Sequence, residues 1–167
     1  MTFQTQYQSP IGWLTMVSDG YSLIGLWMEH QKNPEAGRQI ASAQEGDLPL
    51  FRQVKCWLDQ YFVGEKPSMT DIPIAPQGTA FQQEIWSLLR RIPYGTTRTY
   101  GDLAAEIAVR RHLNSMSAQA VGNAIGKNPI SILIPCHRVI GANGSLTGYD
   151  GGIDRKEWLL RHEGILR

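Results

Sequence analysis

The first 28 residues contain three short runs rich in apolar residues, 3–7, 13–17 and 21–28, and the first run alternates between apolar and polar positions. A period of two is typical of β-strands that bury one face. Turn sequences separate the runs, first Ser9-Pro10-Ile11-Gly12 and then Asp19-Gly20. The pattern therefore predicts a three-stranded antiparallel meander.

A helical period replaces the alternation near residue 50, and Gly64 follows its last apolar position. Cys56 falls on the opposite side of this predicted helix, so we expect its thiol to be exposed. Residues 31–47 are polar and contain Pro34 and two glycines, which predicts a loop. The apolar positions of the helix are Leu50, Phe51, Val54, Trp57, Leu58, Tyr61 and Phe62.

Residues 66–78 are rich in proline and small polar residues, a composition typical of a linker. We therefore predict an N-terminal domain over 1–75 and a C-terminal domain over 76–167. The first contains 5 Lys and Arg against 8 Asp and Glu, and the second 11 against 7. A basic second domain favours contact with a polyanion, although so small an excess also arises by chance.

Three helices are predicted in the C-terminal domain, each beginning after an N-cap residue, Thr79, Thr99 or Ser117. The second and third are short and consecutive, and they resemble a helix-turn-helix. A last helix is expected from Asp154 until Gly164.

Residues 131–134, a serine followed by three apolar residues, predict a short buried strand, and 139–146 contain Asn143-Gly144, a strong β-hairpin signal. A hairpin after a helix-turn-helix is typical of a winged helix. We therefore predict an α+β protein, with a small N-terminal domain of a three-stranded antiparallel sheet and a helix. The C-terminal domain is expected to be winged-helix-like with a helix-turn-helix.

The composition is that of a soluble globular protein, with 42% hydrophobic and 19% charged residues in a chain of 167. No apolar run reaches the ~20 residues that span a bilayer, and the N-terminus lacks the features of a signal peptide. Two distant cysteines, Cys56 and Cys136, are too few for a disulfide framework and form no zinc pattern. We expect a reducing, cytoplasmic setting and no metal or other cofactor.

Cys136 is the strongest chemical candidate, because His137 and Arg138 place a base and a fixed positive charge beside it. Neighbouring residues on a strand point to opposite faces, so direct contact between Cys136 and His137 requires the chain to turn there. A bridging water removes the difficulty. The alternative is that Cys136 is a small buried hydrophobe and Arg138 a solvated charge.

The run Ile134-Pro135-Cys136-His137-Arg138-Val139-Ile140 resembles the active-site signature of the O6-alkylguanine-DNA alkyltransferases, the methylated-DNA–protein-cysteine methyltransferases. Further blocks resemble that family in the family's order and cover essentially all of residues 79–164. These blocks are Phe81-Gln82-Gln83-Glu84-Ile85-Trp86, Ile92-Pro93-Tyr94-Gly95, Thr99-Tyr100, Ala120-Val121-Gly122, Gly126-Lys127-Asn128-Pro129, Gly148-Tyr149, Gly151-Gly152, Lys156-Glu157-Trp158-Leu159-Leu160 and His162-Glu163-Gly164.

The resemblance implies direct-reversal DNA repair. A monomer would bind double-stranded DNA through the minor groove, with its third predicted helix, residues 117–125, as the recognition helix. It would flip an O6-alkylguanine, or less readily an O4-alkylthymine, out of the duplex and move the alkyl group irreversibly onto Cys136. The thioether product resists water, so each molecule would act once. The N-terminal domain would be ribonuclease H-like.

The resemblance also implies roles for single residues. His137 would take the Cys136 proton through a water, and Glu163 would orient the imidazole. Tyr100 would help to rotate the nucleotide and supply a proton, and Asn128 would brace the turn before Cys136. The residues implied in substrate or DNA binding are Gln119, Tyr149, Asp150, Val139, Arg138, Thr99, Ala120, Gly122 and Lys156.

Each role has an ordinary structural alternative. Glu163 would then be a charge near a helix end, Tyr100 and Tyr149 would pack, and Asn128 would be a turn residue before a proline. Without the matched blocks, these alternatives would be favoured.

Three features depart from the family pattern. Gln119 stands where the family has an arginine that fills the space of the flipped base, which predicts weaker base extrusion. The connection over 108–117 is about four residues longer than usual, and its Arg110 and Arg111 are either solvated or clamp a phosphate. Asp150 replaces a serine beside the pocket, where its charge would disfavour anionic groups or change which alkyl sizes fit.

Three other functions remain open from the sequence. A non-catalytic lesion-binding protein would lack the reactive cysteine, and a winged-helix regulator would need no Cys-His pair. A Cys-His hydrolase would turn over repeatedly, because water would release its acyl-enzyme.

Overall fold

The computed structural model describes residues 1–31, 33–69, 71–146 and 148–167. The chain forms two compact units, one of residues 1–77 with 129–131 and the other of 78–128 with 132–167. The domain boundary predicted between residues 75 and 76 places residues 129–131 in the C-terminal domain, whereas in the structure they lie in the first unit. The predicted loop and linker include Lys32 and Thr70, which lie outside the described residues.

The predicted meander of the first unit is confirmed. β1 (Phe3–Ser9), β2 (Gly12–Ser18) and β3 (Leu23–Met28) pair antiparallel in sequence order. A fourth strand, β4 (Gln44–Glu45), pairs in parallel with β1, so the sheet order is β3-β2-β1-β4.

The predicted loop over 31–47 is wrong, because it contains α1 (Pro34–Ser42) as well as β4. Asn33 caps this helix: its side-chain oxygen accepts hydrogen bonds from the backbone N–H groups of Glu35 and Ala36. Pro34 occupies the first turn, where its missing N–H costs nothing. An N-cap followed by proline thus outweighs the polar, glycine-containing composition.

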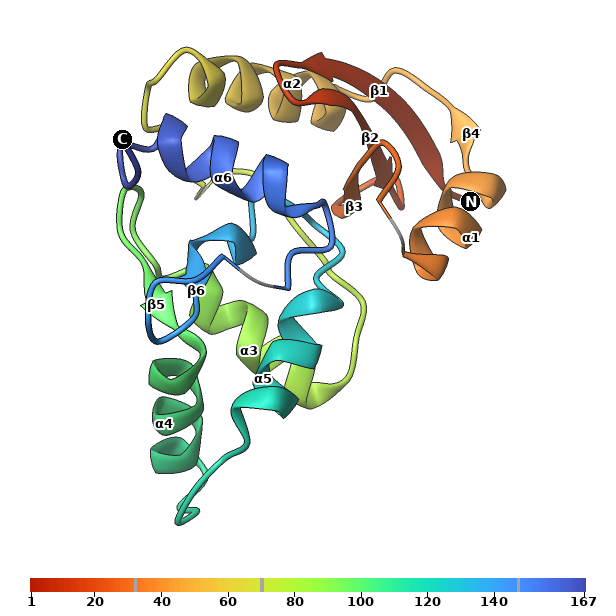
Figure 1. Ribbon diagram of the computed structural model, residues 1–167. Helices are drawn as coiled ribbons and strands as arrows, with labels where there is room; N and C mark the ends of the chain where they lie inside the picture. Colours follow the sequence, from red (N-terminus) through yellow and green to blue (C-terminus); the bar gives the residue numbers. More distant parts are fainter. Residues whose placement is uncertain (32, 70, 147) are drawn as a thin grey trace. The chain divides into compact units, whose positions relative to one another are not determined.

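One helix covers each face of the sheet (Figure 1). The predicted helix after residue 48 is confirmed as α2 (Pro49–Phe62), and the Tyr7 hydroxyl donates to Asp59 of this helix at 2.6 Å. Gln4, on the opposite face of β1, donates to two backbone carbonyls at the end of α1. As predicted, Cys56 is exposed. The apolar cluster on the α1 side comprises Val17, Ile24, Trp27 and Ala36, with Ile40, Ala43 and Ala75 packed against it.

Two short segments pair in parallel with β3. Ile74, within the predicted linker, pairs with Leu23, and Ile130 pairs with Leu26. The predicted strand over 131–134 is wrong: those residues are buried but form turns. Ile132 has φ 70°, a strained value for a β-branched residue, which extended pairing does not allow.

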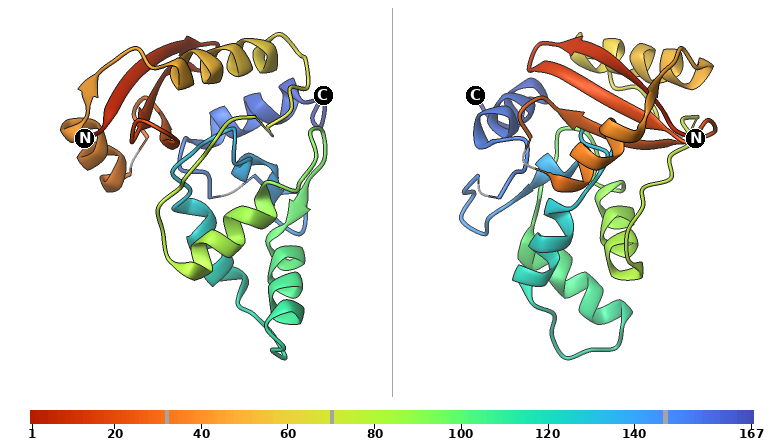
Figure 2. Two further views of the ribbon diagram at one scale, coloured as in Figure 1. Left: turned by 180° about the vertical axis from the view of Figure 1, so that it is seen from behind. Right: turned by 90° about the vertical axis from the view of Figure 1, so that its right-hand side faces the viewer.

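The three predicted N-caps of the second unit are confirmed. Thr79 and Thr99 form capping boxes before α3 (Ala80–Leu89) and α4 (Tyr100–Arg110), and Ser117 caps α5 (Ala118–Gly126). Figure 2 shows these helices gathered in one region of this unit. The Trp86 indole of α3 donates to the Ala124 carbonyl of α5 at 2.8 Å and ties these two helices together.

The predicted hairpin over 139–146 is wrong. β6 (Val139–Ile140) pairs in parallel with β5 (Arg98–Thr99), and the described residues after Gly144 form no returning strand. The Asn143-Gly144 signal does produce a tight turn, closed by a 2.9 Å hydrogen bond from Gly141 N to Ser145 O. The last predicted helix is confirmed as α6 (Ile153–His162), and the α+β class holds.

Candidate active site

Cys136 begins η1 (Cys136–Arg138), a single turn of 3₁₀-helix. Arg138 N donates to Pro135 O at 3.0 Å, so the chain turns at the reactive residue instead of continuing as a strand. The alternation that separates neighbouring strand side chains therefore does not apply here. Cys136 is a free thiol, and the residue is 8% exposed.

Asn128 fixes the segment that leads into this turn. Its side-chain amide donates to the Ile134 carbonyl at 2.8 Å, and the residue is buried two positions beyond α5. This is the bracing position that the sequence predicts for it.

Burial raises the pKa of the Cys136 thiol to about 11, although a hydrogen bond with Asn128 and the positive charge of Lys156 oppose the shift. The thiol is therefore protonated at neutral pH. Because the thiolate is the nucleophilic form, a base must take the proton before the sulfur can attack.

His137 and Glu163 form a fully buried pair, with 2.6 Å between Nε2 and Oε2. Burial alone would raise the pKa of Glu163, but its bonds and attraction to His137 and Arg138 outweigh it and hold that pKa well below the ordinary value. An ionised carboxylate only accepts hydrogen bonds, so Nε2 carries the proton. Burial lowers the pKa of His137, which favours the neutral imidazole. Its Nδ1 then holds a lone pair, and this buried atom has no hydrogen-bond partner among the described residues.

Arg138, which the resemblance implies in substrate or DNA binding, lies inside the unit. Its Nε donates to Glu163 Oε1 at 2.8 Å, and its Nη2 donates to Oε2 at 3.2 Å. Its Nη1 donates to the Ile92 carbonyl at 2.7 Å, and the guanidinium lies 5.6 Å from the Tyr94 ring centroid. With its donors engaged internally and its side chain 10% exposed, Arg138 is not presented to a phosphate backbone.

Lys156, which the resemblance also implies in substrate or DNA binding, is buried as well. The residue is 0% exposed, and its ammonium donates to the Val139 carbonyl at 2.5 Å. Burial lowers the pKa of Lys156 to about 8, which the nearby Cys136 partly opposes. Val139 thus contributes a backbone carbonyl that already accepts one hydrogen bond.

Tyr100, at the start of α4, lies close to the reactive turn. The Lys156 ammonium is 5.8 Å from its ring centroid. A Cβ added to Gly122 of α5 would meet the Tyr100 ring at 3.7 Å, and one added to Gly148 would lie 3.4 Å from the hydroxyl. Burial, followed by the Cys136 charge, raises the pKa of Tyr100, so its hydroxyl keeps its proton.

Tyr149 and Asp150 precede α6 in a turn that Gly152 N closes by donating to Tyr149 O at 3.0 Å. The Tyr149 hydroxyl is enclosed and has no hydrogen-bond partner among the described residues. Burial, then the Cys136 charge, raises the pKa of Tyr149 well above its ordinary value. Asp150 is exposed, and its charge contributes to the raised pKa of Cys136.

The remaining predicted binding residues lie at the starts of α4 and α5. The Thr99 hydroxyl is used in capping, where it accepts from Asp102 N at 3.0 Å. On α5, Gln119 is exposed and Ala120 is half-buried, as is Gly122 in the next turn. These three residues share the helix that the sequence predicts for DNA recognition.

Arg110 and Arg111, in the longer connection, both form ion pairs within the unit. Arg110 pairs with Glu106 at 3.0 Å. Arg111 binds Glu84 through two nitrogens, at 2.9 and 2.6 Å, and its guanidinium lies 5.1 Å from the Phe81 ring centroid. This second contact anchors the connection to α3.

The turn between α3 and β5 is the part of the site that sequence reasoning missed. Gly95 N donates to Glu163 Oε1 at 3.1 Å, and the Tyr94 hydroxyl donates to the His162 carbonyl at 3.4 Å. The sequence predicted these residues only as a helix stop and as one of the matched blocks. The contact is not predictable from the sequence, because 68 residues separate Gly95 from Glu163 at the end of α6.

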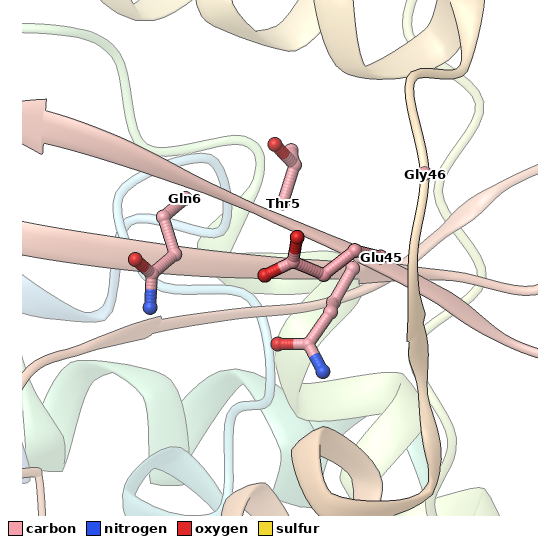
Figure 3. A pocket seen from close by; sticks show the side chains of 5 residues that line it. Thr5, Gln6, Glu45 and Gly46 are labelled. Carbon is pink, nitrogen blue, oxygen red and sulfur yellow. The ribbon is translucent and has the colours of Figure 1, made fainter.

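The first unit contains a hollow outside this cluster. This hollow of about 490 Å³ is lined by Gln4, Thr5, Gln6, Glu45 and Gly46, which include neither a cysteine nor a histidine (Figure 3). Over the described ranges, no group of His, Cys, Asp and Glu side chains is arranged to hold a metal ion. None of the described helices combines the length and apolar character that a membrane crossing requires.

Relatives of known activity match the whole chain. The methylated-DNA–protein-cysteine methyltransferase of Haemophilus influenzae is 43% identical over 166 residues, which cover 98% of this chain and 87% of that protein. The protein of the same name from Methanosarcina acetivorans is 43% identical over 159 residues, 95% of this chain and 96% of that protein.

Solved structures of similar proteins also match this chain. The crystal structure of Mycobacterium tuberculosis O6-methylguanine methyltransferase superposes with a TM-score of 0.82 at 41% identity, covering 98% of this chain and 93% of that one. The M. tuberculosis OGT in complex with DNA gives 0.82 at 40% identity, with coverage of 98% and 94%.

Two family models divide the chain between them. The ribonuclease-like domain of 6-O-methylguanine DNA methyltransferase matches residues 3–76, and the DNA binding domain of the same family matches 80–165. The chain therefore belongs to the 6-O-methylguanine DNA methyltransferase family.

Proposed function

We propose that this protein repairs DNA by taking the alkyl group of an O6-alkylguanine onto Cys136. The observation that carries the proposal is the buried 2.6 Å His137–Glu163 pair one residue from a free thiol. The Cys136 sulfur attacks the saturated carbon, so that an S–C bond forms as the C–O6 bond breaks. The thioether is stable to water, and each molecule acts once.

The raised pKa of Cys136 makes proton removal the first requirement. His137 Nδ1 is the base, because Nε2 is engaged with Glu163 and Nδ1 keeps its lone pair. A water carries the proton from the thiol to Nδ1. Glu163 holds the tautomer and stabilises the imidazolium that forms, as the acid does in a catalytic triad.

The guanine that leaves must gain a proton. The Tyr100 hydroxyl, whose pKa is raised, is a protonated donor close to the Cys136 turn. Tyr149 lines the base pocket, and its enclosed hydroxyl is available to a base edge. Backbone groups of Cys136 and Val139 read the guanine, and Asn128 keeps the turn in place.

We propose that the damaged nucleotide leaves the stack before transfer, because proteins that do chemistry on a base in duplex DNA extrude it first. We propose that α5 enters the minor groove, where Ala120 and Gly122 allow close approach, and that Gln119 occupies the space of the flipped base. Gln119 brings no charge and less stacking surface than arginine, so base extrusion is weaker than in relatives with arginine. O4-alkylthymine is a poorer substrate, and the protein acts as a monomer.

The test is the intact mass of the protein after incubation with a duplex that carries one O6-methylguanine. One added methyl, mapped to Cys136, with one lesion repaired per molecule supports the proposal. An unmodified duplex and the Cys136→Ser variant are the controls and should add nothing. Lesion binding without an adduct would indicate a binding protein, and repeated turnover would indicate a hydrolase.

A further inference from the structure

The Glu163 carboxylate accepts hydrogen bonds on both oxygens from three residues. Oε1 accepts from Arg138 Nε at 2.8 Å and from Gly95 N at 3.1 Å. Oε2 accepts from His137 Nε2 at 2.6 Å and from Arg138 Nη2 at 3.2 Å. The guanidinium of Arg138 thus donates to both oxygens.

We infer that Arg138 is a positioning residue of the alkyl-transfer site: its forked donors hold Glu163 against His137 and keep the imidazole neutral, ready to take the Cys136 proton. The inference rests on the proposed function and adds to it a residue that the proton route does not itself include.

The argument is one of charge balance in a buried site. A lone Glu163 carboxylate beside His137 would draw a proton onto the imidazole, because a buried negative charge needs a positive partner. A protonated His137 is no longer a base. Arg138 cannot lose its proton, so it neutralises Glu163 permanently and leaves His137 uncharged.

The fork is itself rigidly held. Its third nitrogen, Nη1, donates to the Ile92 carbonyl at 2.7 Å, and the Tyr94 ring covers the guanidinium. The side chain is 10% exposed, so water screens its charge little. Two parallel N–H donors fix the plane of a carboxylate, which a point-charge ammonium cannot do.

The charged groups around the His137–Glu163 pair either raise or lower the pKa of His137. Burial, Arg138 and Lys156 all lower the pKa of His137, whereas Glu163 raises it. Cys136 lies in the same turn, and Tyr94 packs on the guanidinium. Tyr149 keeps its proton and adds no charge. Replacing Arg138 therefore removes one of two cations that favour the neutral imidazole.

The test compares Arg138→Met, which removes the charge, with Arg138→Lys, which keeps the charge but not the fork. The His137 ring is titrated by NMR without DNA, and single-turnover methyl transfer is measured from about pH 5.5 to 9. In Arg138→Met, His137 should titrate about one pH unit higher, and transfer at about pH 6 should fall roughly tenfold relative to that variant's own plateau. In Arg138→Lys, the acid limb should stay in place and the plateau should drop several-fold.

Arg161→Met is the matched control, because Arg161 forms an exposed pair with Glu157 on α6 and should leave both profiles unchanged. If Arg138→Met does not fold, two other variants test the inference. These are Arg138→Lys, through its plateau rate, and the double variant Arg138→Met/Glu163→Gln, which removes both charges. In the double variant His137 should titrate at or below its wild-type position.

A His137 titration and a transfer profile that match wild type in all Arg138 variants would overturn the inference. The NMR titration separates this outcome from failure of the proposed function. Wild-type protein that takes no methyl from DNA rejects the proposed function, whether or not Arg138 controls His137.

Discussion

The two units of the chain treat buried polar groups in opposite ways. In the first, the described buried polar residues are hydroxyl-bearing serines, Ser18 and Ser131, and the rest of the core is apolar. The second buries an amide, an imidazole, a carboxylate and two cations. These residues are Asn128, His137, Glu163, Arg138 and Lys156.

The difference supports the proposal that the second unit carries the chemistry. Burying an ion costs several kcal/mol unless partners compensate, so a core built for stability alone avoids it. In the second unit Glu163 is compensated by Arg138 and His137, and Lys156 by the Val139 carbonyl. Such groups are retained where a reaction needs controlled proton affinities.

The largest expected effect is that of Glu163→Gln on methyl transfer. The amide keeps the shape but cannot stabilise the imidazolium, so the single-turnover rate should fall about 100-fold or more. Binding of a methylated duplex, measured by fluorescence anisotropy, should change little. A rate within threefold of wild type would show that the buried pair serves stability and not transfer.

Trp27→Ala probes the apolar unit and should act on stability alone. Removing this buried indole leaves a cavity beside Val17 and Ile24 and should cost about 3–5 kcal/mol of unfolding free energy in urea. The transfer rate per folded molecule should stay within twofold of wild type.

Trp27→Phe is the matched control for that measurement. It removes an indole N–H that has no hydrogen-bond partner among the described residues, so it should cost less than the alanine variant. A Trp27→Ala protein that remains folded but transfers methyl as slowly as Glu163→Gln would contradict the view that the first unit affects stability alone.

Acid should remove the stability that the buried His137–Glu163 pair contributes to the protein. The pKa of His137 is lowered from 6.5 and that of Glu163 from 4.5, so in both cases the unfolded chain binds protons more readily as the pH falls. The contribution of each group to the free energy of unfolding is therefore fully present only above its unfolded pKa. The free energy of unfolding should decrease as the pH falls through about 6.5 and again through about 4.5.

The second of these steps should shrink in Glu163→Gln, because that variant no longer has the titrating carboxylate. Urea titrations at several pH values, read through the tryptophans, measure both steps. A wild-type stability that stays flat from pH 8 to 4 would contradict the assignment of buried, coupled charges.

The smallest effect on stability is expected at the surface. Arg111→Ala breaks a partly exposed pair with Glu84, and such pairs contribute about 1 kcal/mol or less. If Arg110 and Arg111 also clamp a phosphate, replacing both with alanine flattens the salt dependence of DNA binding. An unchanged slope would limit Arg111 to anchoring the connection on α3.

Local signals were sufficient for most of the fold. Capping residues located α3, α4 and α5, short runs between turn signals located β1 to β3, and helical spacing located α2. The helix α1 was not predicted, because the polar, glycine-containing composition of residues 31–47 indicates a loop. Pairings between distant segments were not predictable. The strands β5 and β6, for example, are two residues each, and they pair with each other across about forty residues of sequence.

The sequence by itself determined the family, the reactive Cys136, and the residue types that can move a proton and hold a turn. It could not distinguish a cation that meets DNA from one that is buried, because Arg138 and Lys156 look alike in either setting. The tertiary structure decided this by bringing Glu163 and Ile92 to Arg138, and Val139 to Lys156. The physical reason is that the role of a charge depends on its dielectric surroundings and partners, and folding supplies those from positions 17 to 46 residues away.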